Sequence, residues 1–251
     1  MMLSTRWRTL SLNCLPALAA LWFTQAVVAA DHAEKGDANQ PLFVRVDGTT
    51  ALENERVMVQ RFIIQPGQST GPEVHGARQL LVFVKGGVLT SNTTGRSSFW
   101  PDGRVVWLDE AAHDQGETNT GQRPIELLWI VLKPSAAPVG ASVSTKPAWG
   151  YLNYPNVPGE DVLENNWVIV QRFKMKPGEW EGVHAHNPNT FYIFIKGGKW
   201  VSKSRTHPAG VPGSATDGTI AWMDTIDLSE RHQSGNTGSN ETEVVWVALK
   251  Q

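Results

Sequence analysis

The feature that most constrains this fold is an internal duplication, in which the second half of the chain repeats the first. Four segments match at one fixed offset without a gap, pairing residues 52–54 with 163–165, 59–62 with 170–173, 66–67 with 177–178, and 83–87 with 194–198. After a slightly longer loop in the second copy, residues 107–109 match 222–224 and residues 119–121 match 236–238. Ordered similarity of this extent predicts two structural units with one fold.

Each copy carries the pattern of short β-strands separated by turns. The predicted strands are rich in β-branched and aromatic residues and cover residues 57–64, 80–85, 104–108 and 125–132, and again 167–175, 191–196, 220–223 and 243–249. One further element is expected before each copy, at residues 42–46 and 149–154. No segment shows a sustained helical period with caps. Many short strands with regular turns predict an all-β sandwich or barrel.

The first thirty residues have the three regions of a secretory signal peptide. Arg6 and Arg8 form the positive region, residues 15–23 form a short apolar core, and residues 28–30 are small, which predicts cleavage after Ala30. The apolar run is too short for a comfortable membrane span, and a retained N-terminal anchor is the alternative. The sequence therefore predicts an exported protein, periplasmic or secreted, with no membrane association after signal cleavage.

Removal of the signal peptide changes the chemistry of the chain. The only cysteine, Cys14, lies within it, so the mature chain would have no disulfide and no thiolate ligand. Loss of Arg6 and Arg8 leaves 20 basic residues against 24 acidic residues, a net charge of −4 without a basic patch, which argues against nucleic-acid binding. The predicted domains are residues 31–137 and 138–251, joined near a segment rich in Ala, Ser and Pro at residues 134–147.

A His-x-His pair in the second copy suggests a metal site. His184 and His186 are followed by a turn at residues 187–189 and by an apolar alternating run. Residues i and i+2 of a strand point to one face, so both side chains can approach one ion. The alternative is that both histidines are hydrogen-bonded pocket residues.

The spacing around this pair resembles the first signature motif of the cupin family. Gly178, five residues, His184-x-His186, three residues, position 190, six residues and Gly197 follow that motif. His232 with Asn236 four residues later resembles the second motif, although Asp227 and Ser229 stand where the family has a Pro-x-Gly turn. Two such units resemble a bicupin over nearly the whole mature chain. The resemblance implies two tandem jelly-roll (double-stranded β-helix) cupin barrels, with metal near the mouth of a barrel.

By this resemblance His184, His186 and His232 would be the metal ligands of the second copy. The carboxylate ligand usual in the family falls at Thr190, a poor ligand for a divalent ion, so the expected site has three histidines and water. The implied cofactor is a divalent metal ion, foremost iron, with manganese, nickel or zinc as alternatives. A surface loop position for His232 is the alternative to its role as a ligand.

The first copy lacks most of these ligands. The positions that correspond to the motif residues are Glu73, His75, Gln79 and, counted back from the shared Asn119, Gln115. Amide oxygens are weak ligands for such metals, so this barrel is expected to hold no metal, unless His113 substitutes through a loop shift.

Aromatic residues are expected to shape the pocket of the second copy. Strand alternation from Thr190 places Tyr192 and Phe194 above the metal, and ordinary barrel core is the alternative for Phe194. No catalytic residue is assigned, with Tyr192 and Glu181 as weak candidates for an acid or base. Three tryptophans without an aromatic counterpart in the first copy could also line the pocket: Trp167, Trp180 and Trp200. The recurrence of one arginine in both copies, Arg61 and Arg172, indicates a structural role.

The expected site supports several functions. Three neutral imidazoles leave the charge of an ion uncompensated, which favours a small anionic chelating substrate and an iron-dependent dioxygenase. An isomerase or lyase could use the same ion as a Lewis acid. An exported, non-catalytic protein that binds a small ligand or metal is the second hypothesis, and a purely structural role is the third, because the fold alone does not decide. Whether the chain forms a homodimer is left open by the sequence, because cupin barrels often pair through their sheets.

Overall fold

A computed structural model describes residues 42–73, 76, 78–108, 115–134 and 151–250 of the chain. The predicted signal peptide with Cys14, and His75 and His113, lie outside the described residues, as does the linker after Pro134. The boundary predicted between the two domains also falls outside them. These predictions stay untested.

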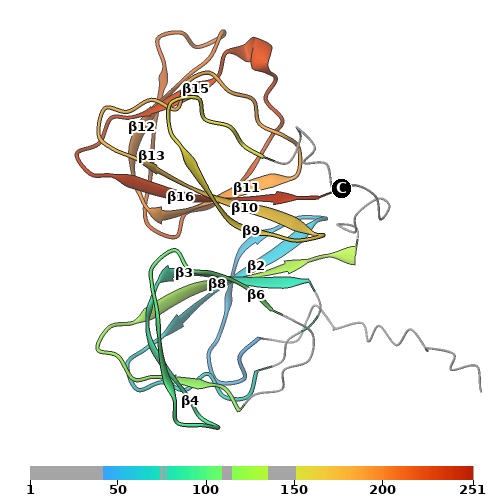
Figure 1. Ribbon diagram of the computed structural model, residues 1–251, viewed down its shortest axis with the longest axis vertical. Helices are drawn as coiled ribbons and strands as arrows, with labels where there is room; N and C mark the ends of the chain where they lie inside the picture. The colour runs from blue at the N-terminus through green and yellow to red at the C-terminus, as the bar shows by residue number, and fades with distance from the viewer. Residues whose placement is uncertain (1–41, 74–75, 77, 109–114, 135–150, 251) are drawn as a thin grey trace, which may run out of the picture. The chain divides into compact units, whose positions relative to one another are not determined.

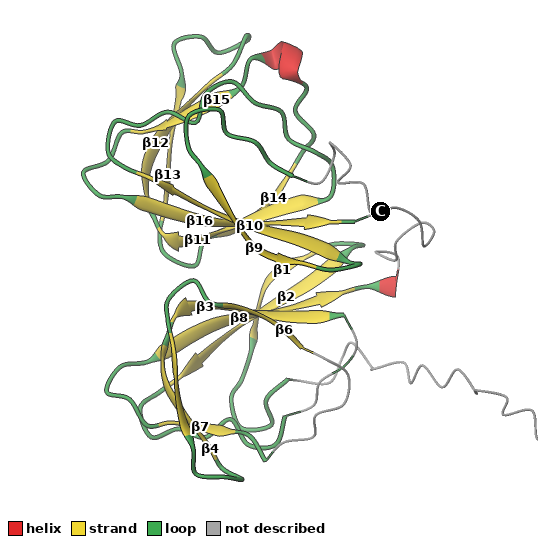
Figure 2. Ribbon diagram, viewed as in Figure 1, coloured by secondary structure: helices red, strands yellow, loops and turns green. Residues whose placement is uncertain are grey.

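Within the described residues, sixteen strands form four antiparallel sheets, two in each half of the chain (Figures 1 and 2). The N-terminal barrel contains β1 (Thr49–Glu53), β2 (Val57–Ile64), β3 (Gln79–Lys85), β4 (Gly87–Ser91), β5 (Ser97–Trp100), β6 (Val105–Leu108), β7 (Glu117–Asn119) and β8 (Ile125–Leu132). The C-terminal barrel contains β9 (Gly159–Glu164), β10 (Val168–Met175), β11 (Thr190–Lys196), β12 (Gly198–Lys203), β13 (Val211–Ala215), β14 (Ile220–Met223), the 3₁₀ helix η2 (Leu228–Glu230), β15 (Gln233–Asn236) and β16 (Thr242–Leu249).

The two halves have the same topology. Each has a five-stranded sheet, ordered β1-β2-β8-β3-β6 in the N-terminal barrel and β9-β10-β16-β11-β14 in the C-terminal barrel. Each also has a three-stranded sheet, β5-β4-β7 or β13-β12-β15. The predicted all-β fold of two jelly-roll barrels is therefore confirmed.

Both faces of the central strands of the five-stranded sheets are buried, which explains the nearly continuous apolar sequences of β3, β8, β11 and β16. In β2, Val57 and Val59 join a core shared by the two halves, whereas Met58 and Phe62 point into the N-terminal barrel. In β10 the matching Val168 joins the same shared core. The shared core consists of matched residues from both halves: Val57, Val59, Leu80, Val82, Val84, Val105, Leu128, Ile130 and Leu132 with Val168, Val170, Phe191, Ile193, Ile195, Val245, Val247 and Leu249.

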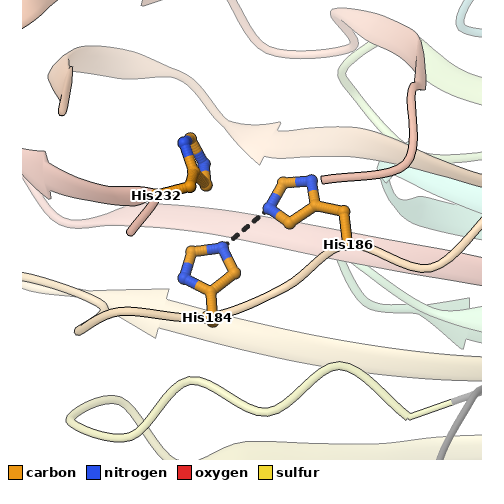
Figure 3. Close-up of side chains that lie close together, drawn as sticks. All are labelled: His184, His186 and His232. Atoms are coloured by element: carbon orange, nitrogen blue, oxygen red, sulfur yellow. Dashed lines mark hydrogen bonds between the residues drawn. The ribbon is translucent and has the colours of Figure 1, made fainter. Parts of the chain in front are cut away.

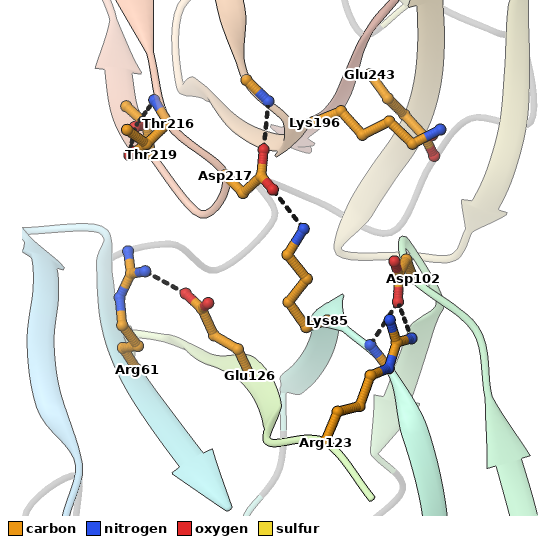
Figure 4. A network of polar contacts seen from close by, with 12 residues as sticks. Arg61, Lys85, Asp102, Arg123, Glu126, Lys196, Thr216, Asp217, Thr219 and Glu243 are labelled. Carbon is orange, nitrogen blue, oxygen red and sulfur yellow. Dashed lines mark hydrogen bonds and ion pairs between the residues drawn. The ribbon is translucent and has the colours of Figure 1, made fainter.

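The contacts of one arginine are also matched in the two halves, and Figure 4 shows the pair of Arg61 with Glu126. Arg61 pairs with Glu126 and donates from Nη2 to the Gly218 carbonyl of the other half at 2.6 Å. Arg172 donates in turn to the carbonyl of Gly103, the counterpart of Gly218. The recurring arginines are therefore structural, as their duplication indicates, and each joins the two halves of the chain.

The sequence prediction was wrong about the elements that precede each copy. Residues 42–46 form only an isolated bridge, Phe43 with Glu73, and residues 151–154 lie in no strand. The strands that precede β2 and β10 are β1 and β9, whose polar, largely exposed residues lack an apolar alternation. The described residues contain no helix that is long and apolar enough to cross a membrane.

Candidate metal centre

The sequence suggests that His184 and His186 lie in a strand. In the structure they lie in the segment just before β11 (Thr190–Lys196), where His186 forms an isolated bridge with Ile226. The backbone N–H of His186 donates to the Ile226 carbonyl at 2.9 Å, and the N–H of Ile226 returns a bond of 3.1 Å. The segment turns into β11 through Asn189, which adopts a left-handed backbone with φ of 58°. Asparagine tolerates this conformation better than most residues, so the turn predicted at residues 187–189 is confirmed.

His232 is placed by a short 3₁₀ helix rather than by a Pro-x-Gly turn. Asp227 caps η2 by accepting the N–H of Ser229 at 2.8 Å, and Arg231 ends it in the left-handed conformation. His232 then precedes β15, and its carbonyl accepts the N–H of His184 at 3.0 Å. A backbone hydrogen bond therefore links the two motifs, which are distant in sequence.

The three predicted ligands meet at one point (Figure 3). One ring nitrogen from each of His184, His186 and His232 lies within 4.8 Å of the other two. The Nε2 atoms of His184 and His186 are 2.7 Å apart, and their rings stack with centroids at 4.7 Å. The ring of His232 stands edge-on to both, at 5.0 and 4.8 Å. The structure therefore brings together all three histidines that the resemblance selects.

Hydrogen bonding leaves the lone pair of His184 Nε2 available. Its Nδ1 donates to the Gly182 carbonyl at 2.9 Å, which fixes the tautomer when the ring is neutral. Gly182 turns this carbonyl towards the ring through a positive φ of 82°, a conformation that glycine adopts without strain. His186 Nδ1 is buried and has no hydrogen-bond partner among the described residues. With a proton on that Nδ1, the His186 lone pair also lies on Nε2, beside that of His184.

Burial keeps the three imidazoles in their metal-binding form. It lowers the pKa of His184 to about 4 and that of His186 to about 3, with a further decrease from His232 in both cases. Burial also lowers the pKa of His232. Two neutral ring nitrogens that face each other at such close range repel unless a proton or a cation lies between them. The donor set therefore fits a divalent ion for which imidazole is a good ligand, such as iron, nickel or zinc.

Thr190 does not take the place of the missing carboxylate ligand. Its side chain is buried, and its hydroxyl donates to the Asn187 carbonyl at 3.0 Å. A carboxylate instead approaches from Glu181, whose Oε2 lies 3.9 Å from Nε2 of His184. From the sequence, Glu181 is only a weak candidate for an acid or a base. The expected uncompensated charge of the ion does not take this carboxylate into account.

Glu181 is buried and held by the neighbouring strand. Its Oε2 accepts the N–H of Ser234 at 2.9 Å. Burial raises the pKa of Glu181 to about 7, although hydrogen bonds from Ser234 and from Tyr154 act in the opposite direction. Tyr154 is itself buried, and burial and the charge of Glu181 raise the pKa of its hydroxyl well above 10.

A cavity of about 160 Å³ opens beside the histidines. Tyr192 and Phe194 line it, as the alternation of β11 predicts, and so does Trp200. The other two tryptophans lie elsewhere: the ring of Trp180 lies under Lys203 and against Gly235, and Trp167 packs on the shared core. Among the described residues no lysine or arginine lines the cavity.

Tyr154 is the residue of the site that the sequence prediction missed. Its ring lies 4.6 Å from that of His184, centroid to centroid, and its hydroxyl faces Glu181. The signal was present in the duplication, because Phe43 is its counterpart at the same fixed offset. The backbone supports this match: Arg45 N donates to Thr70 O at 2.9 Å, and Asn156 N donates to Glu181 O at 3.1 Å.

The matching region of the N-terminal barrel uses its polar groups differently. Gln79, the counterpart of Thr190, accepts the indole N–H of Trp129 at 2.9 Å and is thus committed to the core. Thr70 donates to Glu73, the counterpart of His184, at 3.2 Å. Among the described residues, only the C-terminal barrel has a group of three side chains suited to a metal ion. That the N-terminal barrel holds no metal stays a prediction, because His75 and His113 are not described.

Comparison with known proteins supports the fold. No protein-family profile matches the sequence, and no curated protein matches it. Among solved structures, AerE from Microcystis aeruginosa is 11% identical, with a TM-score of 0.54 over 84% of this chain and 96% of that protein. A salicylate 1,2-dioxygenase from Pseudaminobacter salicylatoxidans is 9% identical, with a TM-score of 0.50 over 86% of this chain and 79% of that protein.

A cupin 2 conserved barrel domain protein from Leptotrichia buccalis is 8% identical, with a TM-score of 0.45 over 84% of this chain and 92% of that protein. The likeness of fold, together with the duplicated topology and the three histidines at the motif positions, agrees with the family that the two motifs suggest. The chain therefore has the cupin fold, repeated in two tandem jelly-roll barrels.

Proposed function

We propose that this protein is an exported, metal-dependent cupin enzyme whose C-terminal barrel acts on a small chelating organic molecule. The observation that carries the proposal is the convergence of His184, His186 and His232 on one point beside a cavity. Iron is the proposed metal and dioxygenation the proposed reaction, because a three-histidine set leaves positions open for substrate and dioxygen. The salicylate 1,2-dioxygenase of similar fold, which by its name acts on a small aromatic acid, supports this class.

The proposed roles follow from the geometry. His184, His186 and His232 would hold the ion, which when bound supplies Lewis-acid chemistry and, for iron, redox chemistry with dioxygen. The Gly182 carbonyl orients the ring of His184, and the backbone bond between His184 and His232 keeps the two motifs together. The rings of Trp200 and Phe194 stack with centroids 5.2 Å apart and form part of the apolar lining of the cavity.

The substrate would bring its negative charge to the metal and not to the cavity wall. No lysine or arginine lines the cavity among the described residues, so the ion would be the cation that holds a carboxylate or enolate. Burying such a charge without a cation costs several kcal/mol, which makes direct coordination the favoured mode. The apolar part of the substrate would contact Phe173, Met223 and Val244.

Metal analysis of the purified protein tests the first half of the proposal. About one equivalent of a redox metal is expected per chain, and His186→Ala should remove it. His207→Ala is the matched control, because His207 is exposed in a loop of the same barrel. Retention of full stoichiometry in His186→Ala would show that the ion lies elsewhere.

Oxygen consumption by the iron-loaded protein, screened against small hydroxy acids, diketones and aromatic acids, tests the second half. Consumption with one class and none with His186→Ala is expected. Tight binding of a compound without turnover would assign a ligand-binding protein instead, and turnover without oxygen uptake would assign an isomerase or lyase.

Export is proposed from the three regions of the first thirty residues. Expression of the full chain in a bacterium followed by fractionation should yield a periplasmic or extracellular product that begins near Asp31. A product of full length in the membrane fraction would instead support a retained anchor.

A further inference from the structure

We infer that Glu181, held in place by Tyr154 and Ser234, recognises a hydroxyl group on the ligand bound at the three histidines. The ligand class is then a compact chelator with one anionic head, a hydroxyl beside the chelating atoms and an apolar body. The inference rests on the proposed function in one respect, since it requires that the ligand bind through a metal ion at His184, His186 and His232.

Glu181 is fixed beside the coordination point. Its Oε2 lies 3.9 Å from Nε2 of His184, and its side chain, only 12% exposed, lines the cavity together with His186 and His232. Two hydrogen bonds of 2.9 Å tie it to Ser234: Ser234 N donates to the side-chain Oε2, and Glu181 N donates to the Ser234 carbonyl. The carboxylate therefore presents acceptor lone pairs at a defined place next to the ligands of the ion.

The N-terminal barrel shows that the fold does not require this carboxylate. At the matching position Thr70 accepts the N–H of Glu117 at 2.9 Å, as Glu181 accepts that of Ser234. A threonine hydroxyl thus accepts a hydrogen bond from the matching backbone N–H of that strand. The partner of Glu181, Tyr154, likewise has Phe43 as its counterpart. The C-terminal barrel therefore has a buried carboxylate and a buried phenol that the shared architecture does without, and both lie at the cavity.

The chemistry of the cavity limits what Glu181 can recognise. A carboxylate repels a second anionic group, and the described lining holds no lysine or arginine to offset one. A hydroxyl on the ligand can donate to it, and a hydrogen bond to a charged acceptor in a buried site is among the stronger ones. The remaining walls are mainly apolar or aromatic: Val157, Phe173, Met175, Phe194, Met223 and Val244. Hydroxylated chelators with an apolar ring or chain are therefore favoured over dicarboxylates.

Two probes that differ by one hydroxyl test the inference. Tropolone is a chelating mono-anion with an apolar ring, and 7-hydroxytropolone adds a hydroxyl beside the chelating oxygens. Calorimetric titration of the zinc-loaded protein avoids oxidation of either probe. The wild-type protein should bind 7-hydroxytropolone at least about tenfold more tightly than tropolone, the effect of one hydrogen bond to a charged acceptor.

Glu181→Thr transfers the residue of the N-terminal barrel and keeps an acceptor for Ser234 N–H. This variant should bind both probes with equal affinity. Tyr154→Phe, the corresponding transfer at the second position, should lower the preference by a few-fold, because it leaves the carboxylate less well held. Glu53→Gln removes one carboxylate from the surface of the other barrel and should leave the preference unchanged. Glu181→Gln provides a second variant if Glu181→Thr does not fold.

The outcomes separate this inference from the proposed function. Equal binding of the two probes by the wild-type protein, or a preference that persists in Glu181→Thr and Glu181→Gln, overturns the inference and leaves the metal site standing. Failure of the wild-type protein to bind zinc at His184, His186 and His232 overturns the proposed function, and the inference with it.

Discussion

Phe43 and Tyr154 occupy the same place in the two barrels, and so do Thr70 and Glu181, and the second member of each pair places a polar group in the lining of the described cavity. The strands around them have the same order and the same hydrogen-bonded neighbours. One hydroxyl and one carboxylate therefore separate the candidate site from its counterpart as clearly as the histidines do. The barrel therefore folds with Phe43 and Thr70 as well as with Tyr154 and Glu181. The presence of Tyr154 and Glu181 thus needs an explanation other than the fold.

The two central tryptophans show the same difference. Trp129 donates its indole N–H to Gln79 at 2.9 Å in the core of the N-terminal barrel. Trp246 has Thr190 in place of that glutamine, and its N–H approaches Tyr154 without reaching hydrogen-bond geometry. A buried unpaired N–H is costly, so at this pair of matched positions the hydrogen bonding is less complete in the C-terminal barrel.

The largest effect should come from transfer of the first barrel's residues into the site. The double variant His184→Glu/His232→Gln carries the residues of positions 73 and 115 and should lower metal content from about one ion per chain to none, because two of three imidazoles are lost. Metal analysis after dialysis measures this. His207→Ala serves as the control, and a double variant that keeps its ion would break the comparison between the barrels.

The arginines that join the two halves should differ in their contribution to stability. Arg172→Ala leaves Glu243, whose side chain is 5% exposed, with only its two lysine partners, and should lower the free energy of unfolding by about 3 kcal/mol. Arg61→Ala leaves the more exposed Glu126 and should cost about 1.5 kcal/mol. Urea unfolding of the full chain compares them. Equal losses would show that the two arginines act as a symmetric pair in energy as well as in geometry.

Removal of the acceptor of Trp129 should be a smaller and purely structural change. Gln79→Thr installs the residue of the C-terminal barrel and should cost about 1–2 kcal/mol, since the buried indole N–H loses its partner. The metal content should not change. Gln65→Thr, at an exposed position of the same barrel, is the control for urea unfolding. A neutral Gln79→Thr would indicate that the barrel rearranges to satisfy Trp129.

The smallest effect concerns the contact between Lys85 and Asp217 (Figure 4). Burial alone would raise the pKa of Asp217, but Lys85, the Gly197 N–H and Lys196 outweigh it and lower that pKa. Because the folded-state pKa lies below the unfolded value, the contact stabilises the protein above about pH 4 and this contribution is lost as the pH falls through the folded pKa. The side chains of Lys85 and Asp217 are 35% and 39% exposed, so their contact should add less than about 1 kcal/mol to the free energy of unfolding.

Asp217→Asn keeps the oxygen that accepts Gly197 N–H and removes only the charge. The difference in unfolding free energy between this variant and the wild type should be present at pH 7 and should shrink below about pH 4. A difference that grows with acid would contradict the sign of the shift.

Much of the fold could be predicted because the repeated strands are long and apolar. The bounds of β2, β8 and β14 agree with the prediction to the residue, since these strands are mainly apolar and are followed by turn residues. The strands of the three-stranded sheets, such as β7 and β15, were missed because Gly, Ser, Thr and Asn carry no period there. β7 pairs with β4, and β15 pairs with β12, through backbone hydrogen bonds. Such bonds do not depend on residue type, so the local sequence does not predict them.

The duplication, the all-β class and the three histidines follow from the amino-acid sequence, because each depends on spacing along one chain. That Glu181 and Tyr154 join the histidines follows from the fold, since these two side chains are distant in sequence and meet where Asn156 N donates to the Glu181 carbonyl. It also decided that Thr190 is committed to its own turn, by a hydrogen bond that no residue type predicts. Spacing can select ligands that share a motif, whereas the groups that surround them come from distant segments and are placed by packing.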